Sequence, residues 1–170
     1  KIIASGSFIN KVIQNKSLIK DPKGIIDLPA GFKYSIISKF EDKMDDGLIV
    51  PDAADGMACF KGEGDNVILV RNHELGHLPL LENSLWEKYP FGENQLEFMK
   101  KNRKKFYDIK DNKTECFGGT TTIVYNTKSD KVEKQYLSLA GTLVNCSGGP
   151  TPWNTWISCE ETVKRAKGKI

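Results

Sequence analysis

Residues that can bind metal ions lie close together near the end of the chain, within 139–161. Cys146 precedes a Ser-Gly-Gly-Pro run, so we expect its thiol to lie at the mouth of a turn rather than inside a strand. The adjacent acids Glu160 and Glu161 end an aromatic and β-branched run that is typical of a strand. A thiolate suits iron, and carboxylates suit calcium or iron. The residue types therefore indicate either a metal site or a polar strand end whose acids are solvated.

A second group of polar residues follows the apolar run 67–70, which has the composition of a buried strand. This run leads directly into Asn72, His73 and Glu74. Side chains at strand ends are held by a rigid scaffold and commonly build functional sites. Glu74 is therefore a candidate metal ligand, and Asn72 and His73 could bind a metal or orient its ligands through hydrogen bonds.

The same segment fits the H-E-x-x-H motif of zinc peptidases, from His73 to His77. In that motif two His on one helix face bind zinc, and the Glu serves as the base. The preceding run is strand-like, Gly76 lies inside the motif and Pro79 follows it, all of which oppose a helix. We therefore expect the match to be accidental and keep the zinc peptidase only as an alternative.

Strand patterns dominate the elements that would position these residues. Strands are predicted at 67–71, 120–125, 132–139 and 153–159. The hairpin formed by the second and third of these, together with the fourth, would supply most of one β-propeller blade. A further strand is predicted at 35–38, and the Asp-rich segment 41–56 is predicted to be a solvated loop, because it lacks the EF-hand spacing.

Residues 80–110 are predicted to form a helical insertion. Within it, residues 93–106 carry acids early and bases late, an order that suits the helix dipole. No aromatic residues are interleaved with these bases, so we expect a solvated basic face and no nucleic-acid partner. The net charge of +3 indicates no strong partner either. No apolar run approaches the roughly 20 residues of a membrane span, so none is expected.

The segment from Gly141 to Glu161 resembles the core motif of the PhoX-type alkaline phosphatases, a family of secreted bacterial phosphatases built on a β-propeller. The residues that carry the resemblance are Gly141-Thr142, Asn145-Cys146, Gly148-Gly149, Thr151-Pro152-Trp153, Thr155-Trp156 and Cys159-Glu160-Glu161. Weaker similarity extends back to Leu28. The resemblance implies an all-β fold, in which residues 1–170 form the N-terminal part of a single partial β-propeller domain with the helical insertion. We expect the chain to be a piece of a longer polypeptide.

The same resemblance implies a metal-dependent phosphatase that hydrolyses small phosphate esters, with iron and calcium as cofactors, in the periplasm or outside the cell. It also implies that Cys146 stays free of a disulfide in order to bind iron. The remaining candidate ligands are Glu161, Glu160, Glu74 and Asn72. His73 and Asn145 would support these ligands from outside the metal's own coordination shell. Consecutive side chains of a strand point to opposite faces, so one of the paired acids is expected to reach the metals, and by analogy we prefer Glu161.

A 170-residue piece is not expected to close a propeller or to complete its metal cluster, so we expect it to be inactive by itself. A non-catalytic β-propeller that binds a ligand or partner remains an alternative, because fold does not determine function. Metal content distinguishes these hypotheses: iron with calcium favours the phosphatase, stoichiometric zinc the peptidase, and no tightly bound metal the binding protein.

Overall fold

The structure is a computed structural model that describes residues 18–76, 100–108 and 116–163. The chain forms two compact units, residues 1–36 and 37–170. In the first unit, the short strands β1 (Leu18–Ile19) and β2 (Leu28–Pro29) pair antiparallel. The intervening loop is organised by Asp21, whose carboxylate accepts a hydrogen bond of 2.6 Å from the Tyr34 hydroxyl. This bond, with the backbone N–H donors of Ile25, Lys23 and Ile26, lowers the pKa of Asp21 to about 2.

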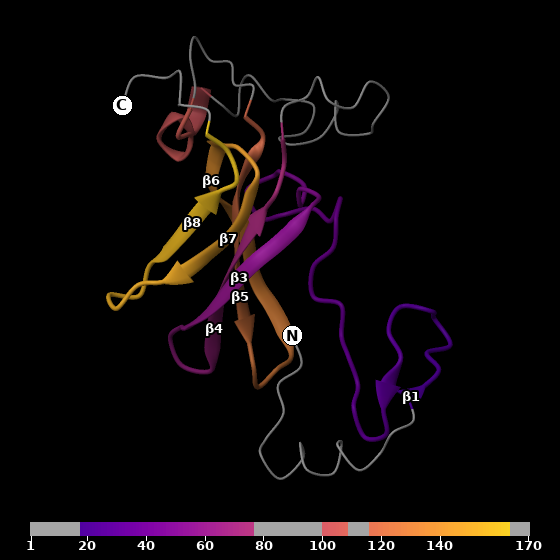
Figure 1. The fold of residues 1–170 in the computed structure, drawn as a ribbon. Coiled ribbons are helices and arrows are strands. Elements are labelled where there is room, and N and C mark those ends of the chain that lie inside the picture. Colours follow the sequence, from indigo (N-terminus) through magenta and orange to yellow (C-terminus); the bar gives the residue numbers. More distant parts are fainter. Residues whose placement is uncertain (1–17, 77–99, 109–115, 164–170) are drawn as a thin grey trace. The chain divides into compact units, whose positions relative to one another are not determined.

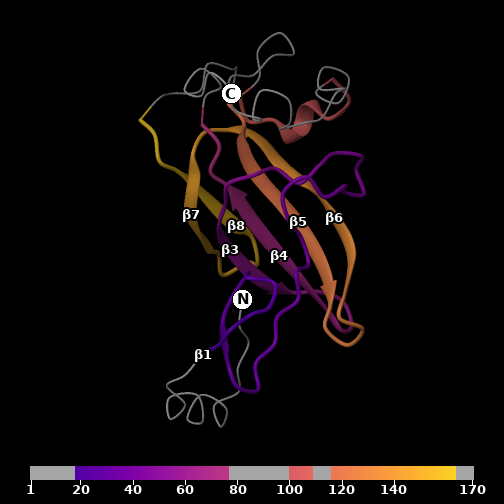
Figure 2. The ribbon, with the colours of Figure 1, turned by 90° about the vertical axis from the view of Figure 1, so that its right-hand side faces the viewer.

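The second unit contains a four-stranded antiparallel sheet in the order β3-β4-β5-β6 (Figure 1). Its strands are β3 (Ala54–Lys61), β4 (Asn66–His73), β5 (Gly118–Asn126) and β6 (Lys131–Thr142). A separate hairpin follows, made of β7 (Asn145–Pro150) and β8 (Trp156–Glu160). Strand β7 lies beside β3 and β4, so the hairpin packs on the four-stranded sheet at one end (Figure 2).

The strands predicted at 67–71, 120–125 and 132–139 are confirmed as β4, β5 and β6. The fourth predicted strand begins at Trp156 instead of Trp153, because residues 151–155 form a turn in which the Thr151 N–H donates to the Thr155 carbonyl at 2.8 Å. The expectation that this strand joins the β5–β6 hairpin is wrong, since β8 pairs with β7.

The position of Cys146 also differs from the expectation: it lies inside strand β7 and not at the mouth of a turn. The two glycines that suggested a turn are paired with β8, Gly148 opposite Ser158 and Gly149 opposite Ile157. A side chain at Gly148 would clash with the indole ring of Trp156, whose Cζ2 atom would lie 2.5 Å from an added Cβ. Gly148 is therefore required for the close approach of the two strands, not for a turn.

Two expectations for the N-terminal half are corrected. Residues 35–38 do not form a strand, whereas β3 occupies part of the segment predicted to be a loop. The loop that precedes β3 also has a structural role. The carboxylates of Asp45 and Asp46 accept hydrogen bonds of 2.7 and 2.8 Å from the backbone N–H groups of Gln135 and Leu137. The loop therefore covers part of the outer edge of β6, which would otherwise expose unpaired backbone groups.

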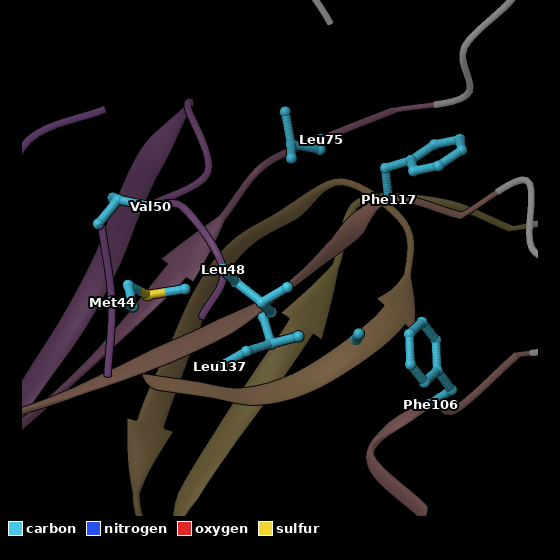
Figure 3. Close-up of a cluster of buried hydrophobic side chains, with 8 residues drawn as sticks. Met44, Leu48, Val50, Leu75, Phe106, Phe117 and Leu137 are labelled. Carbon is cyan, nitrogen blue, oxygen red and sulfur yellow. The ribbon is translucent and has the colours of Figure 1, made fainter. Parts of the chain in front are cut away.

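The main hydrophobic cluster forms between this loop, the residues beside the sheet ends and strand β6 (Figure 3). Its buried members are Met44, Leu48, Val50, Leu75, Phe106, Phe117, Leu137 and Ala140. Phe106 follows the short 3-10 helix η3 (Arg103–Lys105) and bridges to Ala140 at the end of β6. Leu75 comes directly after Glu74, so the cluster anchors the chain segment that leaves β4.

The described residues therefore have the all-β fold that was predicted. They do not form a closed propeller. The helical insertion is not supported: most of the predicted segment lies outside the described residues, and within 100–108 only residues 100–101 and the short 3-10 helix η3 are helical. None of the helices in the described part of the chain is long and apolar enough to cross a membrane.

Candidate metal centre

Three carboxylates from separate chain segments converge beside the end of β4, and we call Asp55, Glu74 and Glu161 the carboxylate cluster. Glu74 directly follows β4, and its backbone N–H donates to the Ala53 carbonyl at 2.8 Å. This bond brings Glu74 next to the start of β3, where its side chain shares a hydrogen bond with Asp55. That hydrogen bond, then burial and the charges of Asp55 and Glu161, raise the pKa of Glu74.

Backbone hydrogen bonds hold Glu161 near Glu74. The Glu161 N–H donates to the Val144 carbonyl at 2.8 Å, and the Val144 N–H donates to the Leu75 carbonyl at 2.9 Å. Val144 adopts the left-handed conformation, with φ of 53°, at the junction between β6 and β7. The residues after β8 are thus connected through Val144 to the residue that follows Glu74.

The neighbouring acid Glu160 lies elsewhere. Its Oε1 atom accepts a hydrogen bond of 2.6 Å from the Leu143 N–H. Glu160 also lines a cavity of about 440 Å³, together with residues that include Tyr107, Thr142 and Trp156. The structure therefore places the two adjacent acids in different surroundings, with Glu161 in the carboxylate cluster and Glu160 at the cavity.

Cys146 lies at an irregular step in the β7–β8 pairing, between Asn145 opposite Glu160 and Ser147 opposite Cys159. Its thiol is half-buried, and Sγ lies 3.9 Å from the Cys159 carbonyl oxygen. It is one of four free cysteines. Strand β3 passes close by, because a Cβ at Gly56 would lie only 2.8 Å from the Cys146 carbonyl oxygen. Asp55 precedes this glycine, so the thiol and Asp55 belong to neighbouring strands.

Asn72 and Asn145 are both fully buried, and they belong to one hydrogen-bond network. The Asn145 amide accepts a bond of 2.6 Å from Thr142 Oγ1 and donates one of 2.7 Å to Ser158 Oγ. Ser158 in turn donates to Asn72 Oδ1 at 2.9 Å. The network connects β6, β7, β8 and β4.

His73 is also fully buried, in a different network. Its Nδ1 atom lies 2.9 Å from the Asp52 carbonyl oxygen, which requires a proton on Nδ1, so Nε2 accepts a bond of 2.8 Å from Thr121 Oγ1. Burial lowers the pKa of His73 to about 4. Arg71 donates to the same threonine hydroxyl, at 3.2 Å from Nη2. Successive residues of a strand face opposite sides, so Asn72 and His73 serve separate networks.

The zinc-peptidase alternative requires a helix through His73. The structure instead ends strand β4 at His73, and residues 74–76 are not helical. His77 lies outside the described residues. The motif needs residues i and i+4 on adjacent turns of a helix, and an extended strand does not bring them together. In addition, both ring nitrogens of His73 are already hydrogen-bonded. The motif match is therefore accidental.

Within the described ranges, no three His, Cys, Asp or Glu side chains are already arranged to hold a metal ion. The chemistry of the carboxylate cluster nevertheless fits a hard cation, because a cation between Asp55 and Glu74 would take the place of the proton whose hydrogen bond raises the pKa of Glu74. The free, half-buried thiol of Cys146 fits a softer metal. Asp55 was missed by the sequence analysis, which assigned it to a solvated loop. The signal that could have found it is its place before Gly56, at the start of a strand.

A comparison with protein families matches residues 13–170 to the family model described as PhoX, Alkaline phosphatase PhoX. No curated protein and no solved structure matches the chain. The matched range includes every candidate ligand described above.

Proposed function

The chain belongs to the PhoX alkaline phosphatase family, and on that premise we propose that it contributes ligands to a metal centre that hydrolyses phosphate esters. The observation that supports this proposal most strongly is the convergence of Asp55, Glu74 and Glu161 from three chain segments. Neighbouring acids repel one another, and a bound cation would offset that repulsion.

The proposed calcium ligands are the oxygens of the carboxylate cluster, and the proposed iron ligand is the Cys146 thiolate. Phosphate-monoester hydrolysis is among the slowest uncatalysed reactions, and bound cations would neutralise the charge of the phosphate group. The residues of the chain hold negative charge at fixed positions for those cations. Glu74 is fixed by its backbone bond to Ala53, and Glu161 by its bond to Val144.

Glu160 and Asn72, expected from the sequence to be ligands, are given other roles in this proposal. Glu160 fixes the backbone at Leu143, just before Val144, and so supports the position of Glu161. His73 holds the end of β4 in place through Asp52 and Thr121.

Calcium titration of the purified chain tests the site. Asp55→Asn, Glu74→Gln and Glu161→Gln should each weaken calcium binding at least about tenfold, because each removes a negative ligand. The matched control is Glu133→Gln on β6, which hydrogen-bonds to Asn66 and Asn126 at the other end of the sheet. Equal calcium affinity in the three cluster variants and the control would refute the site.

We place the protein in the periplasm or outside the cell, because members of this family are exported. The proposed substrate is a small phosphate ester. If the complete enzyme bound metals without hydrolysing such esters, a binding role for the same fold would replace the phosphatase proposal.

A further inference from the structure

We propose that Asn72 is a positioning residue that fixes the β7–β8 hairpin, and with it Cys146 and Glu161, relative to Glu74. This inference rests on the proposed metal centre and deepens it. It replaces the role of metal ligand that the sequence suggested for Asn72.

The hydrogen bonds of the Asn72 amide leave no free acceptor on its oxygen. Oδ1 accepts bonds of 2.9 Å from both Trp156 Nε1 and Ser158 Oγ, and Nδ2 donates a bond of 2.8 Å to the Ser147 carbonyl. An indole N–H can only donate and a carbonyl can only accept, so these partners determine the orientation of the amide. A metal ion could reach Oδ1 only by displacing Trp156 or Ser158.

These three bonds reach both strands of the hairpin at positions next to the candidate ligands. Ser147 directly follows Cys146 on β7, and Ser158 precedes the Cys159-Glu160-Glu161 run. Asn72 itself lies on β4, two residues before Glu74, which directly follows the strand. One side chain thus connects the three segments that carry the thiol, Glu161 and Glu74.

Burial makes this connection rigid. Asn72 has no exposed surface, so water cannot replace a lost partner without entering the interface. Asn145 donates to Ser158 Oγ at 2.7 Å, which leaves the Ser158 hydroxyl hydrogen to be donated to Asn72. A Cβ at Gly56 would lie 3.5 Å from Asn72 Nδ2 and 2.8 Å from the Cys146 carbonyl oxygen, so β3 also comes close to the connection.

The test uses the full chain with Asn72→Ala, Asn72→Asp, Trp156→Phe and the milder Ser158→Ala. The control is Asn66→Asp, at the start of the same strand, where Asn66 bonds to Glu133. The first readout is metal-free: the NMR shift and hydrogen-exchange protection of the Trp156 indole N–H. The second is calcium affinity, measured by titration. Circular dichroism establishes that each variant is folded.

A positioning role predicts that Asn72→Ala lowers Trp156 indole protection at least about tenfold, and that Asn66→Asp leaves it unchanged. It also predicts that Asn72→Ala and Trp156→Phe each weaken calcium binding about tenfold, and that the double variant is no weaker than either single variant. Asn72→Asp should weaken binding as well, because it loses the donor to Ser147 and places a charge against that carbonyl oxygen. If Asn72→Ala unfolds, Ser158→Ala should give the same losses on a smaller scale.

A metal ligand would behave in the opposite way. Asn72→Asp would then keep or strengthen calcium binding, Trp156→Phe would leave it unchanged, and the positioning proposal would be overturned. If the wild-type chain bound no calcium at all, the calcium site proposed for this chain would fail, independently of the role of Asn72. The indole protection would still decide the role of Asn72: its loss in Asn72→Ala supports the proposal, and its retention overturns it.

Discussion

Asp55 and Glu74, two acids from neighbouring strands, share a hydrogen bond at the end of the four-stranded sheet. The hydrogen bond raises the pKa of Glu74, and a cation at the same position would replace the shared proton. Asp55 comes from the start of β3 and Glu74 from the residue after β4, so the pair exists only because these strands are adjacent. Both calcium binding by the carboxylate cluster and the stability of the metal-free chain should therefore depend on the protonation of this pair.

Calcium binding should strengthen as pH rises through the raised pKa of Glu74 and should release a proton. Below that pKa the shared proton must be removed before both carboxylates can bind a cation. Titration calorimetry in two buffers of different ionisation enthalpy measures the released proton directly. Asp55→Asn should reduce the proton release, because it removes the acid that contributes most to raising the pKa of Glu74. Proton release that is the same in wild type and Asp55→Asn would contradict this account.

In the metal-free chain the same pair should lower the free energy of unfolding at higher pH. The pKa of Glu74 is raised in the folded protein above its ordinary 4.5, so the folded state holds the proton longer than the unfolded state does. Stability should therefore fall as pH rises from 4.5 through the folded pKa, and Glu74→Gln should remove this loss. Urea unfolding with a chelator present measures the stability of the wild type and of Glu74→Gln. If stability changed with pH equally in the two proteins, Glu74 would not cause this loss.

His73 should destabilise the protein in mild acid. Its folded pKa of about 4 lies below the ordinary 6.5, so the unfolded chain takes up a proton first as pH falls. The stability that comes from neutral His73 is complete above 6.5 and decreases as pH falls toward 4, by about 3 kcal/mol in total. Because Glu74 acts in the opposite direction over part of this range, the comparison is made in the Glu74→Gln background. There His73→Gln should flatten the pH profile of unfolding, and a profile that keeps its slope would exclude this role.

The close approach of β7 and β8 gives a paired test of the hairpin. Gly148→Ala should destabilise the protein by about 1–3 kcal/mol, because the added methyl group meets the Trp156 ring and the Ile157 carbonyl. Gly149→Ala should change stability by less than about 0.5 kcal/mol, since an added Cβ there has no atom within 4 Å. Thermal unfolding followed by tryptophan fluorescence compares the two. Equal effects would show that the packing of Trp156 on Gly148 is not required.

The strands that could be predicted from the sequence are those whose pattern is local. Strand β4 is an apolar, β-branched run, and β5 and β6 are separated by a polar turn, so composition alone identified them. Strand β7 was missed because its Gly-Gly-Pro run is typical of a turn. Its extended form depends on pairing with β8 and on the space that Gly148 leaves for Trp156. Such contacts between segments have no signature in a single stretch of sequence.

The candidate site shows the same division. Cys146, Glu74 and Glu161 were proposed as ligands from their chemistry and the family resemblance, and as ligands they stay predictions. Asp55 was not proposed, because an Asp-Gly pair in a polar segment predicts a loop until the pairing of β3 with β4 is known. The hydrogen bonds of the Asn72 amide could not be predicted either, since its partners Ser147, Trp156 and Ser158 lie far along the chain.

The measurement that tests the central claim most directly is the hydrolysis of a chromogenic phosphate ester by the complete metal-loaded enzyme, with iron and calcium counted in each variant. Cys146→Ala should empty or scramble the iron position, and Glu161→Gln should weaken calcium binding. Both should lower turnover by at least about a hundredfold with circular dichroism unchanged, and Lys104→Ala should leave turnover and metal content as in the wild type. Unchanged turnover in Cys146→Ala, or a wild-type enzyme with neither phosphatase activity nor bound iron, would contradict the account.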